Sequence, residues 1–97
     1  MAAYLIVLRE QTLDESELKQ YGRLAKATFA GHRIKFHAAY GPIRVLEGAP
    51  FEAAVVLEFD DISAAEAWYH SPQYQEALRH RLSGASSRAL IVEGLPT

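Results

Sequence analysis

The chain has 97 residues, of which 49% are hydrophobic, and its 10 basic and 12 acidic residues give a formal net charge of −2. This size and balance predict a single domain over residues 1–97, and they argue against a nucleic-acid or anionic-membrane partner. The lack of cysteine excludes disulfides and thiolate sites, and it fits a reducing compartment. The apolar start is too short for a membrane span and lacks a basic leader, so we expect a cytoplasmic protein.

Residues 4–8 form a continuously apolar run, which predicts a strand that is buried on both faces. A helix is expected to follow, with either Thr12 or Asp14 as its N-cap, and Gly31 is expected to end it. The apolar stripe of this helix, at three- and four-residue spacing, contains Leu18, Tyr21, Leu24, Ala25 and Phe29.

Residues 34–40 alternate between two kinds of side chain, which predicts a strand with two unlike faces. One face carries Ile34, Phe36, Ala38 and Tyr40, and the other carries Lys35, His37 and Ala39. Gly41 and Pro42 favour a turn after this strand. Residues 43–46 are then either the return arm of a hairpin or a continuation of the strand after a bulge.

Residues 53–59 predict a second central strand, because apolar and β-branched side chains occupy both alternating sets. Ser63 followed by Glu66 has the spacing of a capping box and predicts the start of a second helix. Ser71 and Pro72 are expected to break this helix, because the residue before a proline is extended and proline starts a helix well. The apolar stripe of the segment after the break contains Tyr74, Ala77, Leu78, Arg81 and Leu82.

Gly84 is expected to end this segment, and the nearly all-apolar run of residues 88–93 predicts the last strand. The resulting order is βαββαβ, which predicts an α+β, ferredoxin-like antiparallel sheet. Its two helices, the second one broken, lie on one face, and residues 4–8 and 53–59 form the middle strands. Because the helices cover one face only, the second apolar face predicts a homodimer in which two sheets pack face to face.

The sequence AWYHSPQYQ of residues 67–75, together with Arg81 and the IVEG of residues 91–94, resembles domain-of-unknown-function family 1330. The LEG of residues 46–48 and the strand end at residues 56–60 extend this resemblance over nearly the whole chain. The resemblance implies the dimeric α/β barrel superfamily, which includes cofactor-free monooxygenases, lactone isomerases and haem-handling proteins.

Several aromatic and charged side chains are candidates for a binding site, and three of them are also candidates for catalysis: His37, Tyr74 and Arg81. Histidine is the usual general base among side chains, so His37 is a candidate for that role, whereas the alternative is a hydrogen-bonded or exposed strand histidine. The candidate ligand-binding residues are His37, Tyr40, Glu47, Trp68, Tyr74 and Arg81.

Trp68 and Tyr74 either wall an apolar pocket or belong to the core. Arg81 lies on an apolar helix stripe, where a guanidinium needs an acceptor. Glu47 or Glu58 would supply that acceptor in an internal salt bridge, and an anionic ligand would supply it in a binding site.

We therefore expect a pocket between sheet and helices that binds a small apolar or anionic molecule, with cofactor-free chemistry of monooxygenase or isomerase type as one version. The alternative is a non-catalytic structural or protein-interaction module. No cofactor or metal is expected, because the remaining histidines have no partner at metal-ligand spacing. Haem on His37 is disfavoured, because no second histidine supports such a site.

Overall fold

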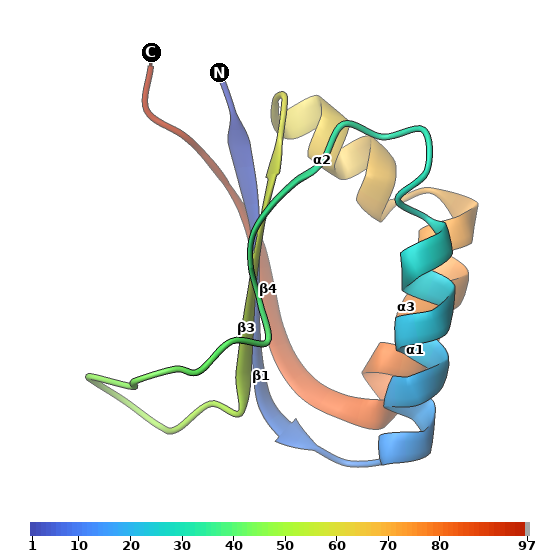
Figure 1. The fold of residues 1–97 in the computed structure, drawn as a ribbon, viewed down its shortest axis with the longest axis vertical. Coiled ribbons are helices and arrows are strands. Elements are labelled where there is room, and N and C mark those ends of the chain that lie inside the picture. The colour runs from blue at the N-terminus through green and yellow to red at the C-terminus, as the bar shows by residue number, and fades with distance from the viewer. Residues whose placement is uncertain (97) are drawn as a thin grey trace.

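The computed structural model describes residues 1–96, in which four strands form one antiparallel sheet in the order β2-β3-β1-β4. In chain order the elements are β1 (Ala3–Thr12), α1 (Glu15–Ala27), β2 (Lys35–Ala39), β3 (Ala53–Phe59), α2 (Ile62–Tyr69), α3 (Pro72–Gly84) and β4 (Ala85–Glu93). All three helices cover one face of the sheet, and the loop over residues 40–52 extends on the opposite side (Figure 1). The predicted ferredoxin-like fold is confirmed, with β1 and β3 in the middle. Within residues 1–96, no helix is long and apolar enough to cross a bilayer.

Aspartates cap the first two helices. Asp14 caps α1 by accepting hydrogen bonds from backbone N–H groups of the first turn, which decides between the two predicted caps. Asp61 caps α2 by accepting a hydrogen bond from the Ala64 N–H at 2.7 Å. The predicted capping box of Ser63 and Glu66 is wrong, because Asp61 lies nearer to the strand end and starts the helix two residues earlier.

The break between α2 and α3 lies at Ser71 and Pro72, as predicted. The Ser71 hydroxyl donates to the Trp68 carbonyl at 2.8 Å and accepts from the Tyr74 N–H at 3.2 Å. Pro72 occupies the first turn of α3, where the missing N–H costs no hydrogen bond. This junction brings the rings of Trp68 and Tyr74 together, with their centroids 4.1 Å apart.

The two faces of the sheet differ in their cover. The face under the helices carries the core, which is built from buried side chains such as Leu5, Leu57 and Phe59. The opposite face, which we call the open face, also presents apolar groups: Tyr4, Ile6, Leu8, Val56, Leu90 and Val92. On this face Leu90 is 54% exposed and Val92 is 45% exposed, so the described chain leaves apolar surface in water.

Three details of the sequence prediction are corrected. Residues 43–46 form no strand but belong to the loop over residues 40–52, whose backbone is left-handed at Tyr40 (φ 62°) and Gly48 (φ 87°). Helix α1 ends at Ala27 rather than near Gly31, which instead lies in the turn that follows. Leu82 is 63% exposed, because it lies about 100° around the helix from the buried Arg81.

Helices α1 and α3 pack so closely at one point that only glycine fits there. A Cβ atom on Gly84 would lie 3.0 Å from the Asp14 carbonyl oxygen and 3.0 Å from Leu18 Cγ. The Gly84 carbonyl also accepts hydrogen bonds from the N–H groups of Leu13 and Asp14, at 2.7 and 3.0 Å. The end of α3 is thereby joined to the start of α1.

We expect Gly84→Ala to lower the free energy of unfolding by about 1–3 kcal/mol, because the added methyl group overpacks this contact. Gly22→Ala is the matched control, since a Cβ on Gly22 meets nothing within 4 Å. In the interior of α1 that control should gain about 0.5–1 kcal/mol from alanine's higher helix propensity. Urea denaturation measures both values, and equal stability of the two variants would contradict the close packing.

Candidate functional site

A cavity of about 300 Å³ lies between the helix-covered face of the sheet and helices α1 and α3. Its floor comes from β1, β2 and β3, with Ser87 contributed by β4, and its roof comes from α1, Trp68 and α3. The lining residues that are exposed to solvent come from α1, from β2 and from the residue directly after β2: Gly22, Lys26, Phe36, Ala39 and Tyr40. The mouth of the cavity therefore lies between α1 and β2.

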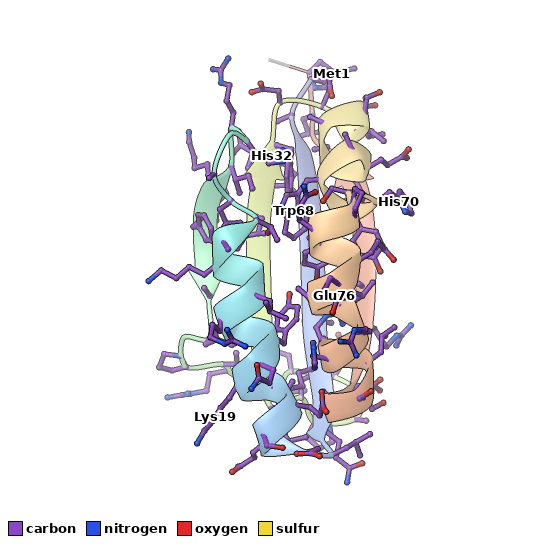
Figure 2. All side chains as sticks on the ribbon, turned by 90° about the vertical axis from the view of Figure 1, so that its right-hand side faces the viewer. Met1, Lys19, His32, Trp68, His70 and Glu76 are labelled. Atoms are coloured by element: carbon purple, nitrogen blue, oxygen red, sulfur yellow. The ribbon has the colours of Figure 1, made fainter. Side chains whose placement is uncertain are left out.

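One end of the cavity, the aromatic end, is built around Trp68, which is 1% exposed. Its ring stacks on Phe29 with an interplanar angle of 19°, and it also packs against Tyr74. Figure 2 shows Trp68 in the space between the helices, whereas Glu76 lies on their outer surface. The indole N–H donates to the Thr28 hydroxyl at 3.1 Å, so Trp68 has a protein partner for its polar atom and serves as an apolar wall.

Two phenols lie in the middle of the cavity. The hydroxyl oxygens of Tyr21 and Tyr74 are 2.9 Å apart, and their rings meet edge to face. In such a pair one hydroxyl donates to the other, so one O–H remains to donate to a further acceptor. Burial raises the pKa of Tyr21, and the neighbouring Tyr74 adds to the shift. Tyr21 is therefore neutral at physiological pH.

The other end of the cavity, the cationic end, is formed by Arg9, Arg81 and Ser87. In the part of the chain that the structure describes, the buried side-chain polar atoms without a hydrogen-bond partner are Arg9 Nε, Arg81 Nε and Ser87 Oγ, and all three residues line this cavity. Unpaired buried polar groups are rare in proteins. Their concentration at one end of one cavity marks it as a place for an acceptor.

Arg81 has aromatic neighbours rather than an acidic partner. Its guanidinium carbon lies 5.9 Å from the ring centroid of Tyr21, and the residue is 7% exposed. Burial works to lower the pKa of Arg81, but the adjacent phenols of Tyr74 and Tyr21 outweigh it and raise the pKa. The guanidinium is thus charged at any physiological pH.

Arg9 differs from Arg81 because it has an acidic neighbour. Its Nε lies 3.2 Å from Glu52 Oε2, a contact that has the distance of an ion pair without the alignment of a hydrogen bond. The guanidinium carbon of Arg9 lies 5.9 Å from the ring centroid of Tyr40. Arg9 therefore connects the cationic end to the mouth.

The structure brings four of the six predicted ligand-binding residues to this cavity: Tyr40, Trp68, Tyr74 and Arg81. It places His37 on the open face, where Nε2 lies 2.6 Å from Glu58 Oε1 and the ring packs on Tyr4. The prediction that His37 lines the pocket is corrected, because the neighbouring Phe36 faces the cavity and successive strand residues point to opposite faces. The β-bulge between Phe36 and Ala38 turns Ala39 toward the cavity, opposite Val55. Tyr40 directly follows β2 with a left-handed backbone (φ 62°), and it also lines the cavity.

Glu47 also lies away from the cavity, in the loop over residues 40–52, beside a separate shallow hollow that includes Leu8. The predicted salt bridge from Arg81 to Glu47 or Glu58 is therefore wrong. Glu58 faces the open side of the sheet, and Glu47 is held by a loop that extends away from the helices (Figure 1). Of the two predicted acceptors for Arg81, an internal carboxylate and an anionic ligand, the ligand is the one that remains.

Sequence reasoning missed Arg9, Tyr21 and Ser87 as site residues. Arg9 follows Leu5 and Val7 at two-residue spacing, so strand alternation alone places it on the core face. Ser87 lies directly across from Arg9 in the pairing of β1 with β4. The pairing of Arg9 with Ser87 could not be predicted, because the sequence does not show the register of two strands.

Metal ligands do not cluster in the described chain. Within residues 1–96, no group of three or more His, Cys, Asp or Glu side chains lies close enough together to hold a metal ion. Two histidines each contact a single glutamate. His37 contacts Glu58, and His80 Nδ1 lies 2.6 Å from Glu17 Oε2, which joins α3 to α1.

Comparison with known proteins gives a family match and structural neighbours. The family model for a domain of unknown function, DUF1330, matches residues 2–95. No curated protein matches the chain. The fold is similar to a protein of unknown function from Rhodopseudomonas palustris, with 18% identity and a TM-score of 0.75 over 99% of this chain and 84% of that one.

Two further neighbours share the fold at low identity. A dimeric ferredoxin-like protein of unknown function from Thermobifida fusca is 18% identical, with a TM-score of 0.64 over 96% of this chain and 91% of that one. SnoaB, a cofactor-independent oxygenase from Streptomyces nogalater, is 12% identical, with a TM-score of 0.60 over 99% of this chain and 94% of that one. At these identities the likeness concerns the fold alone.

The aromatic end depends on one buried hydroxyl. Thr28 Oγ1 accepts from the Trp68 indole and donates to the Ala25 carbonyl at 2.6 Å. We expect Thr28→Val to lower the free energy of unfolding by about 1–3 kcal/mol, because it leaves the indole N–H buried without an acceptor. Thr28→Ser retains the hydroxyl and should lose less. Chemical denaturation decides, and equal losses in both variants would show that the hydrogen bond contributes little.

Proposed function

The chain belongs to the DUF1330 family, a domain of unknown function, and on this premise we propose that it is a homodimer that binds a small, mainly apolar molecule in each subunit. The observation that carries the proposal is the cavity between the sheet and helices α1 and α3. Its volume of about 300 Å³ is at the lower end of the range for small-molecule sites. Its lining is mostly aliphatic and aromatic, with a few polar groups at one end, as such sites usually are.

The lining supports binding more than base-catalysed chemistry. Among the described residues, those that line the cavity include no histidine, aspartate or glutamate. Tyr21 is held neutral by burial, so it is a poor proton acceptor at physiological pH. SnoaB is a cofactor-independent oxygenase, and an enzymatic version of the proposal would have to use Tyr74 or Arg81 to orient a substrate that is already reactive.

The open face supports the homodimer. Three of the four strands carry large apolar side chains there, including Ile6 on β1, Val56 on β3 and Leu90 on β4. A standard interface buries about 800 Å² on each partner, and apolar surface contributes about 25 cal/mol per Å² before the costs of association. Structural neighbours are described as dimeric ferredoxin-like proteins. Packing two open faces together leaves each cavity on the outer, helix-covered side of its own sheet.

A blocked cavity tests ligand binding. Ala53 lines the cavity on β3 and is 5% exposed, so Ala53→Leu adds volume to the space that a ligand would use. We expect the variant to fold and to lose ligand-induced stabilisation. For the unmodified chain, a ligand at 100 times its Kd should add about 2.7 kcal/mol of stability.

The measurement is a thermal-shift screen with neutral arenes, lactones and aromatic acids. Ala67→Leu, at an exposed position of α2, is the matched control and should keep any shift of the unmodified chain. If no compound shifts the unmodified chain, or if a shift survives in Ala53→Leu, the cavity is not the binding site. Such a result would favour the alternative, a non-catalytic structural or interaction module.

A charge on the open face tests the dimer. Val56 faces this side of the sheet, between Ile6 and Ala38 on the neighbouring strands. We expect Val56→Glu to give monomeric or aggregated protein, because the charge would be buried between two sheets without a partner. Ala67→Glu adds the same charge on α2 and should leave the dimer intact. Sedimentation velocity measures both, and a well-folded monomer of the unmodified chain at micromolar concentration would contradict the proposal.

A further inference from the structure

The charges that line the cavity point to one class of ligand. Its lining contains three cationic side chains, Arg9, Lys26 and Arg81, and no carboxylate among the described residues, although the whole chain has a net charge of −2. We propose that the ligand is a carboxylic acid with an apolar, ring-containing body, and that its carboxylate binds at Arg81 while its body reaches toward Trp68. This inference rests on the proposed function and specifies the ligand of the same cavity.

The first support is the state of Arg81. It is 7% exposed, and its Nε is buried without a hydrogen-bond partner. A buried charge is costly unless an acceptor pairs with it, and a guanidinium matches a carboxylate with two parallel N–H donors. Among residues 1–96, no carboxylate forms an ion pair with Arg81, and the predicted partners Glu47 and Glu58 lie on the other side of the sheet.

The second support is the number of uncompensated charges. Arg9 has a carboxylate beside it, since its Nε lies 3.2 Å from Glu52 Oε2. Lys26 lies at the exposed mouth, where water screens its charge. Of the three lining cations, Arg81 is therefore the one that is buried and has no carboxylate partner among the described residues. One buried positive charge matches a monoanion, which is the charge of a carboxylate at neutral pH.

The third support is the presence of further donors at the same end. Ser87 Oγ is buried without a partner, and Ser87 lies across from Arg9 on the paired strand. The phenol pair of Tyr21 and Tyr74 retains one O–H for another acceptor. A carboxylate has two oxygens that accept several hydrogen bonds, so a single group would satisfy donors on β4 and on the helices.

The length of the cavity sets the body of the ligand. Arg9 and Ser87 mark the cationic end, whereas Leu5, paired with Leu57 on the next strand, belongs to the same buried cluster as Trp68 of the aromatic end. Leu5 and Arg9 are four residues apart on β1, which corresponds to about 13 Å at ~3.3 Å per residue. The space between the ends is walled by apolar and aromatic side chains. A ring on a short chain from the carboxylate fits this arrangement.

The test compares 3-phenylpropanoate with its neutral isostere, 3-phenylpropanamide, by calorimetric titration of the purified full chain. We expect the acid to bind about 10- to 100-fold more tightly than the amide, because hydrogen bonds between two charged groups are stronger than those to a neutral acceptor. The fluorescence of Trp68, the only tryptophan, should change with either compound. The Nε–H resonance of Arg81 should shift with the acid.

Two methionine variants locate the carboxylate. Arg81→Met retains much of the side-chain volume and should abolish the preference for the acid over the amide, while the chain remains folded because no ion pair is broken. Arg79→Met is the matched control: Arg79 lies on the exposed side of α3, where its Nε donates to Glu76 at 2.9 Å. That variant should bind the acid as the unmodified chain does.

The outcomes separate the two proposals. If the amide binds as tightly as the acid, or if Arg81→Met keeps the preference, the cavity binds ligands but the carboxylate assignment is overturned. If neither compound binds and no neutral arene shifts the melting temperature, the proposed function fails and this inference fails with it. Tighter binding by the acid, lost in Arg81→Met and kept in Arg79→Met, supports both.

Discussion

The hydroxyl of Ser71 holds together the part of the structure on which the cavity depends. It bonds to the last turn of α2 through the Trp68 carbonyl and to the first turn of α3 through the Tyr74 N–H. With Pro72 starting the new helix, the chain changes direction while the N–H groups of His70 and Ser71 still donate to carbonyls of α2. Trp68 is thereby pressed against Tyr74, and Tyr74 in turn meets Tyr21 of α1. A straight helix through this point would place the two rings on different sides of the axis.

The elements around this junction are largely readable in the sequence, because they rest on local rules. The central strands follow from apolar runs, and the helix break follows from Ser71 and Pro72. Asp61 shows the limit of such rules, since Ser63 matches the capping pattern but the helix begins two residues earlier, with Asp61 as its N-cap. The loop over residues 40–52 shows a second limit of local rules. Residues 43–46 are largely apolar, yet they form no strand after Pro42.

The site was less predictable than the fold, because it depends on which face each strand residue takes. His37 was assigned to the pocket from its chemistry, yet it lies next to Phe36 and so faces away. Arg9 lies just beyond the apolar run of residues 4–8, but the two-residue alternation that it shares with Leu5 and Val7 places it in the cavity. Both errors concern the sheet face that a strand residue takes. That face follows from its position in the two-residue alternation and not from the type of its side chain. Arg81, which the helix stripe placed on the inner side of α3, is buried and lines the cavity, whereas Leu82 of the same predicted stripe is exposed.

Tyr40, at the mouth of the cavity, adopts a backbone conformation that lowers the stability of the fold. Its backbone is left-handed, a conformation that destabilises a residue with a side chain by roughly 1–2 kcal/mol relative to the right-handed region. Glycine or asparagine would adopt it with less strain. The tyrosine at this position lowers stability through its backbone, while its ring lies against Arg9 at the mouth of the cavity. The requirements of stability and of ligand binding therefore conflict at residue 40. In a randomised library, selection for thermal stability alone would drift toward glycine at position 40, whereas selection for a working cavity would keep an aromatic ring.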